Sequence, residues 1–498
     1  MEIAKPVQRC SSDHQEDAAS ILSTSSESPE LRSQDEDIRS IASESVHSVT
    51  STFKYGHESF EPFRIKVAQL CQEIWPLAGT TSRRKRSRCR ALIRRLFRRT
   101  PSTIFTIHRG PGGSFNRIVD IEVKESAKGT PTSYVLRIPR FENARPDRDL
   151  AILEYVCQYY PSVPVAEVVK SDLTCNNVIG KPYLLQEKLS GFQVHSDAAE
   201  YLHLTHQQKL DFASQFGTIL RTLFERKSKE PGLIELTSPS NTAEPSHGEN
   251  ACKFCIRPFE VGRPSPMGTE GHLDATPASG YQPDYTSPLN FLQGQLGRWQ
   301  ADAEMRGDEL EAECMDKSSR LAAQLEKAGF LGKEGNAYVP SHRDLNNGPQ
   351  NILIDVDQNG KLSITGILDW DSAIFAPAVV ACQPPMWIWA WDSNGEEDEK
   401  LANETPPTME AWQLKKAFED AVGPGWLRLS YGHGFRLARK LCEFAFEGVH
   451  SSWKLEEMQE LFREWAAMRP EGMEKIDGPM DDEDSPSDND DSNGLSSI

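Results

Sequence analysis

A predicted β-hairpin with polar residues gathered at one end constrains the fold of this chain more than any other feature. Two apolar runs, residues 352–356 and 362–368, flank an Asn-Gly pair, which is a strong hairpin signal. Asp344 precedes the hairpin in a loop, Asn351 leads into its first strand, and Asp369 follows its second strand. Because the two strands run antiparallel, these three side chains are expected at the same end of the hairpin.

This set of oxygen-bearing side chains is what phosphoryl transfer needs. Magnesium binds hard oxygen ligands, usually one or two carboxylates together with substrate phosphates. A further carboxylate orients the acceptor hydroxyl and takes its proton. An ordinary turn would explain any one of the three residues, but it explains the whole set poorly. The residues therefore indicate a phosphotransferase site.

The rest of the chain divides into a strand-rich part followed by a helical part. Alternating and β-branched patterns predict five strands and one helix over 147–159. The predicted strands are 103–109, 115–124, 133–139, 167–170 and 183–189. Helical periodicity then dominates, and the predicted helices are 205–224, 287–299, 301–328, 409–422, 426–446 and 454–467. This pattern predicts an α+β fold.

Charge is concentrated outside this folded part. The 498 residues carry a formal net charge of −19, of which the ends 1–60 and 471–498 hold −6 and −9. Both ends are poor in apolar residues and are predicted to be disordered acidic arms, the first of them rich in serine. Residues 61–470 keep only −4, so the overall acidity says little about partners. Residues 227–288 are rich in Pro, Gly, Ser and Thr and are predicted to be an insertion loop.

A strongly basic segment lies in a predicted N-terminal extension over 61–100. Ten of the seventeen residues from Arg83 to Arg99 are Lys or Arg, and the apolar residues among them have helical spacing. This basic helix is compatible with nuclear import or with an anionic surface. It is equally compatible with a solvated flank that pairs with the acidic ends. Nucleic acid is not the expected partner, because the signal is confined to this one segment.

Cysteine usage and hydropathy favour a cytoplasmic protein, with nuclear accumulation as the alternative if the basic helix is an import signal. The ten cysteines are scattered and no apolar signal segment follows Met1, so a reducing compartment is expected. Residues 372–391 lack charge, but their three prolines argue against a membrane span. Cys252 and Cys255 form a lone Cys-x-x-Cys pair, which predicts two free thiols rather than a zinc site.

The stretch around Asp344 and Asp369 resembles the catalytic and metal-binding loops of the aminoglycoside phosphotransferase family, in its fungal branch of kinase-like small-molecule phosphotransferases. The resemblance covers residues 101–470. It implies a bilobal protein-kinase-like fold, with a small β-rich N-terminal lobe over 101–189 and a larger, mainly α-helical C-terminal lobe over 190–470.

The resemblance assigns roles to the residues around the hairpin. Asp344 matches the catalytic base, and His342 would brace its loop. Asn351 and Asp369 match the two magnesium ligands. Asn351 lies seven positions after Asp344, two more than in the family pattern, and Asn346 or a neighbouring asparagine is the alternative ligand.

The resemblance also extends to a nucleotide site in the first lobe. A glycine-rich stretch with Gly112, Gly113 and Ser114 resembles the phosphate-covering loop, whose backbone N–H groups point at phosphates. Arg137 stands where protein kinases carry a lysine, and Glu154 on the next predicted helix would pair with it. An ordinary glutamate at the rim of the core is the alternative for Glu154.

The join between the two lobes falls at Gln186 and Glu187, where the family contacts adenine through main-chain groups. ATP and Mg²⁺ are therefore the expected cofactors, and the partner is a small-molecule hydroxyl acceptor. The acidic run 396–399 is consistent with a cationic acceptor, or with a solvated loop. A non-catalytic, pseudokinase-like nucleotide-binding scaffold or adaptor is the alternative function. The sequence carries no signal of oligomeric state.

Overall fold

The computed structural model describes residues 57–75, 103–111, 115–124, 129–141, 144–194, 203–237, 254–257, 287–331, 338–346, 348–390, 399–449 and 451–469. The chain divides into two compact units, residues 1–65 and 66–498. The lobes and the site described below all belong to the second unit. The predicted acidic ends and the basic helix from Arg83 to Arg99 lie outside the described residues, except for residues 57–60.

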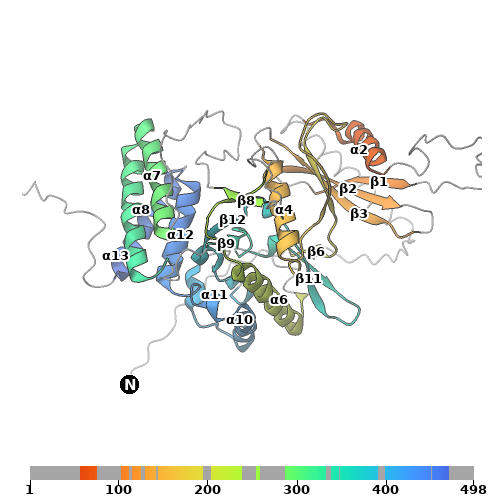
Figure 1. The fold of residues 1–498 in the computed structure, drawn as a ribbon. Coiled ribbons are helices and arrows are strands. Elements are labelled where there is room, and N and C mark those ends of the chain that lie inside the picture. The colour runs from red at the N-terminus through yellow and green to blue at the C-terminus, as the bar shows by residue number, and fades with distance from the viewer. Residues whose placement is uncertain are drawn as a thin grey trace, which may run out of the picture. The chain divides into compact units, whose positions relative to one another are not determined.

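The first part of the second unit is a five-stranded antiparallel sheet with strand order β1-β2-β3-β5-β4 (Figure 1). Apolar side chains alternate along β2 and β3 and are buried on one face, as Val119, Ile121 and Leu136 are. Helix α4 follows β3 and packs against β4 and β5. The elements here are α2 (Phe60–Ile74), which begins in the first unit, β1 (Ile104–Arg109), β2 (Asn116–Lys124), β3 (Thr132–Pro139), α4 (Pro146–Tyr159), β4 (Val168–Asp172) and β5 (Tyr183–Glu187).

The second part is mainly helical. Helix α6 packs on α10, and α7 on α8 (Figure 1). The helices are α6 (His206–Glu225), α7 (Pro288–Arg306), α8 (Glu309–Ala328), α9 (Ala378–Ala381), α10 (Met409–Val422), α11 (Pro424–Leu427), α12 (His433–Glu447) and α13 (Ser452–Met468). Their apolar faces form one core that includes buried tryptophans at positions 299, 426 and 465.

Short strands inside the helical part carry the predicted hairpin. Strand order β11-β10-β6 makes one small sheet, β12 pairs with β9, and β7 pairs with β8. Their bounds are β6 (Phe192–Gln193), β7 (Leu233–Leu236), β8 (Phe254–Arg257), β9 (Tyr338–Ser341), β10 (Ile352–Val356), β11 (Leu362–Ile367) and β12 (Ile374–Pro377). An antiparallel sheet followed by a helical region confirms the predicted α+β, kinase-like fold.

Two predicted helix boundaries are wrong, and glycine explains both. Helix α7 continues past residue 300 to Arg306, because the left-handed Gly307 (φ 74°) ends it there and Asp308 caps α8. The predicted helix over 426–446 is two helices, with Gly432 (φ 105°) between them. Side-chain periodicity continued across both breaks, and so it did not reveal them.

The charge-free segment after Asp371 is irregular and largely buried. Besides α9, it contains the last residue of the 3₁₀ helix η2 (Trp370–Ser372), the strand β12 and the 3₁₀ helix η3 (Met386–Ile388). Phe375, Val379 and Trp387 are among its buried side chains. Among the described residues, no helix is long and apolar enough to cross a membrane.

Candidate active site

The loop between β9 and β10 brings Asn351 back to Asp344. The Asn351 Nδ2 atom donates to the Asp344 carboxylate at 2.9 Å and to the Asp344 main-chain carbonyl at 3.1 Å. The 3₁₀ turn η1 (Pro349–Asn351) leads directly into β10. The main-chain N–H of Leu368 donates to the Asn351 carbonyl at 2.8 Å, which ties the loop to the end of β11. The two additional residues therefore do not separate Asn351 from Asp344.

The alternative ligand Asn346 is held through its amide nitrogen and its main chain, while its buried Oδ1 atom has no hydrogen-bond partner among the described residues and stays available as a ligand. Its Nδ2 atom donates to the Gln383 carbonyl, and its own carbonyl accepts from the Trp387 indole, both at 3.0 Å. These bonds hold Asn346 against the buried segment after β12. Asn347 lies outside the described residues.

His342 connects the loop with the end of β11. Its buried ring makes a 2.7 Å hydrogen bond through Nε2 to the Leu368 carbonyl, and lies edge-on to Trp370 with ring centroids 4.7 Å apart. Burial lowers the pKa of His342 below its ordinary value, so the ring is neutral near pH 7. A neutral ring must carry its proton on Nε2 to donate to a carbonyl. His342 thus braces the loop as a hydrogen-bond donor.

Two residues of this region have left-handed backbone conformations. Arg343 (φ 68°) and Asp369 (φ 60°) are the non-glycine residues with positive φ in the described ranges. Each such residue costs about 1–2 kcal/mol, and neighbouring contacts must hold it in place. Arg343 forms an ion pair with Glu447 and lies 5.4 Å over the Phe446 ring. Backbone strain of this kind is concentrated on either side of the hairpin end, where the predicted site lies.

Arg137 of β3 reaches from the sheet to the helical part. Its Nη2 atom donates to the Asp371 carboxylate at 2.6 Å, and Asn116 of β2 lies 3.5 Å from the same oxygen. Burial acts to lower the pKa of Arg137, but nearby carboxylates outweigh it and raise the pKa above its usual value, in the order Asp371, Asp149 and Asp369. The guanidinium is therefore firmly charged between the two parts of the site.

Asp149 belongs to the group of carboxylates around Arg137, together with Asp371 and Asp369, and sequence reasoning missed it. It lies in the first turn of α4. Burial raises its pKa to about 7, with the Asp371 carboxylate acting in the same direction and Arg137 opposing it. Asp371 was likewise given no role, although it stands two positions after Asp369. The only available signal was the position of Asp149 near the start of the helix that follows the Arg137 strand.

Asp369 interacts electrostatically both with the charged groups around Arg137 and with Asp344. Burial and then the Asp371 carboxylate raise the pKa of Asp369. Arg137 opposes the shift, while the Asp344 carboxylate adds to it. The site thus brings several carboxylates close enough to repel one another, with one guanidinium to offset them.

The remaining predicted residues are distributed along the first part. Glu154 is half-buried on α4. Gln186 is buried in β5 between its partners Val135 and Val168, while Glu187 is exposed at the strand end. Gly112, Gly113 and Ser114 lie outside the described residues.

The structure describes one residue of the acidic run 396–399 and one cysteine of the Cys-x-x-Cys pair. Glu399 of the acidic run is ion-paired with the buried Arg439, and is therefore not free to attract a cation. Glu396, Glu397 and Asp398 are outside the described residues, as is Cys252. Cys255 is a free thiol. In the described part of the chain, no group of three or more His, Cys, Asp or Glu residues could hold a metal ion by itself.

The donor set nevertheless fits magnesium. This ion usually takes one or two carboxylates and completes its shell with phosphate and water oxygens, so it does not need three protein acids. Asp369 is destabilised as a carboxylate by burial and, to a smaller extent, by its acidic neighbours. Asn351 donates to Asp344 through Nδ2, which leaves its Oδ1 atom as an acceptor. A divalent cation beside Asp369 would relieve the repulsion.

These features define a class of protein: an α+β chain in which a sheet arginine and a hairpin with Asp, Asn and Asp meet, as in kinase-like phosphotransferases. The sequence model of the phosphotransferase enzyme family matches residues 112–380, more than half of the chain. The chain belongs to this family, which confirms the predicted resemblance.

Further comparisons add little to this assignment. A choline kinase from Cryptosporidium parvum has 12% sequence identity and a TM-score of 0.30, covering 73% of this chain and 90% of that chain. These values are too low to support an argument about substrate. No curated protein matches the chain.

Proposed function

We propose that the protein transfers the γ-phosphoryl group of ATP to a hydroxyl group of a small molecule. The observation that supports this most is the hydrogen bond from Asn351 to the Asp344 carboxylate. It joins the expected base and the expected metal ligand across a loop that is longer than the family pattern. Family membership supports the same class of reaction.

Asp344 acts as the base in this proposal. A carboxylate within reach of the acceptor hydroxyl orients it and takes its proton as phosphorus is attacked. Asn351 donates to one carboxylate oxygen at 2.9 Å, which fixes the carboxylate orientation and leaves the other oxygen for the hydroxyl. His342 holds the loop through its bond to Leu368 and takes no part in proton transfer.

Arg137 binds phosphate oxygens in this proposal. Its guanidinium offers five N–H groups in a rigid fork. Only one of them is used, by Asp371, in a hydrogen bond among the described residues. Asp369 and Asn351 would hold Mg²⁺, and the ion would supply positive charge beside the transferred group. Catalysis then depends on positioning and on charge stabilisation.

The acceptor and the location stay predictions from the sequence. A cationic acceptor would now depend on the three acids before Glu399, because Glu399 itself pairs with Arg439. A cytoplasmic location, with nuclear import through the segment from Arg83 to Arg99 as the alternative, is consistent with the free cysteines of the described residues.

The proposal is tested by Asp344→Asn, assayed for transfer from labelled ATP over a panel of amino sugars, choline-like amines and sugar alcohols. We expect turnover to fall by about 10²- to 10⁴-fold, because general-base catalysis contributes this much. Thermal stabilisation by magnesium-ATP should persist. The matched control is Asp355→Asn, an exposed aspartate on β10 in the same hairpin.

Each outcome of this test has a clear meaning. A parent protein that magnesium-ATP stabilises but that transfers no phosphate to any member of the panel would favour the pseudokinase-like scaffold. A folded protein without nucleotide stabilisation would contradict the phosphotransferase proposal.

A further inference from the structure

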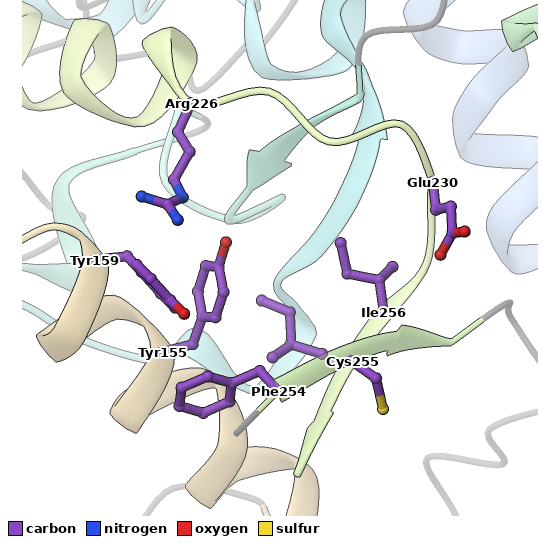
Figure 2. A pocket seen from close by; sticks show the side chains of 8 residues that line it. Tyr155, Tyr159, Arg226, Glu230, Phe254, Cys255 and Ile256 are labelled. Carbon is purple, nitrogen blue, oxygen red and sulfur yellow. The ribbon is translucent and has the colours of Figure 1, made fainter. Parts of the chain in front are cut away.

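A cavity lies beside α4, among residues that are not part of the site described above. It has a volume of about 220 Å³ and is open to solvent. Figure 2 shows its lining, which comes from α4, from the chain after α6, and from β7 and β8. The lining residues are Tyr155, Tyr159, Arg226, Glu230, Ile234, Phe254, Cys255 and Ile256.

Aromatic rings form one wall of this cavity. The Tyr155 ring lies 4.6 Å from Tyr159 and 5.3 Å from Phe254 between centroids, the latter edge to face. Tyr155 and Phe254 are buried, so their positions are fixed by packing. A wall of this kind favours flat apolar groups, which pack edge-on or offset against it.

The volume of the cavity sets how large a group can lie inside it, while its open side lets a substituent reach solvent. A buried cavity of about 150 Å³ takes one benzene ring, whereas sites for drug-sized molecules begin near 300 Å³. At about 220 Å³ this cavity fits one aromatic ring with a small substituent.

Arg226 supplies a charge next to the aromatic wall. Its guanidinium carbon lies 3.9 Å above the centre of the Tyr159 ring, and its N–H groups reach the Tyr155 hydroxyl (Figure 2). The residue is exposed, and among the described residues it has no carboxylate partner within ion-pair distance. Stacking on Tyr159 fixes the plane of the guanidinium and leaves N–H groups at its edge for a ligand.

Glu230 is the only other charged group in the lining, and it is differently placed. It is exposed, and its main chain is fixed by two hydrogen bonds with the Ser228 hydroxyl, at 2.8 and 3.0 Å. Figure 2 shows Glu230 on the opposite side of the pocket from the aromatic pair of Tyr155 and Tyr159. The charge that adjoins the ring surface is therefore positive.

We propose that this cavity binds a single-ring aromatic carboxylate. The ring packs against Tyr155, Tyr159 and Phe254, and the carboxylate accepts two hydrogen bonds from the edge of the Arg226 guanidinium. Paired N–H···O bonds between a guanidinium and a carboxylate are short and directional. The proposal does not depend on phosphoryl transfer, because none of the lining residues belongs to the phosphotransferase site.

The test measures binding of four probes to the full chain by ligand-observed NMR and calorimetry. Benzoate has both the ring and the carboxylate, benzyl alcohol has the ring without charge, benzylamine has the opposite charge, and acetate has the charge without the ring. We expect saturable binding of benzoate. Benzyl alcohol and benzylamine should bind at least about tenfold more weakly, since a charge-assisted hydrogen bond contributes that much. Acetate should also bind at least about tenfold more weakly, because it lacks the ring that packs against the aromatic wall.

Two variants locate the binding in the cavity. Arg226→Gln should weaken benzoate binding by about tenfold or more, and Tyr159→Leu should weaken it as well by removing the stacked ring. Arg221→Gln is the matched control, because Arg221 is an exposed arginine one turn earlier that pairs with Glu225 outside the cavity. It should leave benzoate binding unchanged. Circular dichroism confirms that each variant is folded.

Three results would overturn the proposal. The first is no saturable binding of benzoate to the folded full chain. The second is benzylamine binding as tightly as benzoate, which would assign the cavity to Glu230 and a cation. The third is benzoate binding that survives Arg226→Gln in a folded protein, which would place the ligand elsewhere.

Discussion

Arg439 and Arg137 are both largely withdrawn from water, and they are satisfied in opposite ways. Arg439 of α12 pairs with Glu399 and also donates to the carbonyls of Val379, Cys382, Leu429 and Ser430. Arg137 of β3 makes one hydrogen bond within the described residues, to Asp371, although several carboxylates act on it. One cation has a full set of hydrogen bonds, while the other has an excess of negative charge around it.

This difference is the reason why we assign Arg439 to the stability of the fold and propose Arg137 for ligand binding. The Arg439 side chain is 6% exposed and its Glu399 partner 11%, so neither can be hydrated if the other is lost. Arg137 and Asp371 are 14% and 29% exposed, and the carboxylates around them repel one another. A cluster with unbalanced charge and unused N–H groups is suited to a charged ligand, whereas a balanced buried pair is suited to holding the fold.

The largest expected effect is on the structural arginine. Arg439→Met leaves Glu399 buried without a partner, which should lower the free energy of unfolding by about 3–5 kcal/mol. Urea denaturation followed by fluorescence measures this. The double variant Arg439→Met/Glu399→Gln should recover part of the loss. A change below about 1 kcal/mol would contradict the structural role.

The functional arginine should respond in activity rather than in stability. Arg137→Met should reduce phosphoryl transfer by about 10²- to 10³-fold, because it removes the donor that we propose for developing phosphate charge. Its stability loss should be less than half that of Arg439→Met, because water can reach Asp371. Arg137→Lys keeps the charge without the fork and should retain part of the activity. Equal losses of stability in the two methionine variants would remove the distinction between the arginines.

The burial of Asp149, together with repulsion from the Asp371 carboxylate, predicts a pH effect of intermediate size. The pKa of Asp149 is about 7 in the folded chain and about 3.9 in an unfolded one. The folded state therefore holds the proton more tightly, and stability falls as pH rises from about 4 to 7.

Asp149→Asn removes this part of the pH dependence. In EDTA, the parent should lose about 1 kcal/mol or more relative to the variant between pH 5 and 8. Urea midpoints at several pH values measure the difference. Parallel curves for the two proteins would show that Asp149 ionises normally.

The smallest effect is expected for an arginine outside both groups. Arg221 and Glu225 form an i,i+4 pair on α6 at 2.7 Å, with side chains 55% and 61% exposed. Arg221→Gln should change stability by less than about 0.5 kcal/mol. A larger loss in the same urea measurement would mean that exposure is a poor guide to the value of an arginine in this protein.

Much of the site followed from local sequence, and the rest depended on contacts that local sequence does not contain. Asn351 could be placed because it is fused to β10, so the strand carries it to the hairpin end whatever the loop length. Asp149 could not, because helical periodicity shows which residues share a face but not which face meets Arg137. Hence Glu154 was named and Asp149 was missed; a pairing of Glu154 with Arg137 stays a prediction.

The cavity beside α4 was beyond sequence reasoning for a related reason. Tyr159 and Phe254 are far apart in the chain. In addition, an aromatic residue with helical spacing is as compatible with a position in the core as with one that lines a cavity. The helix breaks at Gly307 and Gly432 were missed for a different reason. The glycines are visible in the local sequence, but the apolar periodicity that continues across them favoured unbroken helices.

Helix α4 has a consequence for how this protein can change over evolutionary time. Asp149, near the start of the helix, interacts with Arg137 and Asp371. Tyr155 and Tyr159, near its end, line the cavity beside α4. Asp149 and Tyr155 are about 9 Å apart along the helix axis. A rigid helix moves as one body, so a substitution that shifts it for the benefit of one site is also felt at the other. Substitutions in α4 are therefore expected to change the Arg137 cluster and the cavity together, and to be tolerated only where both can accommodate them.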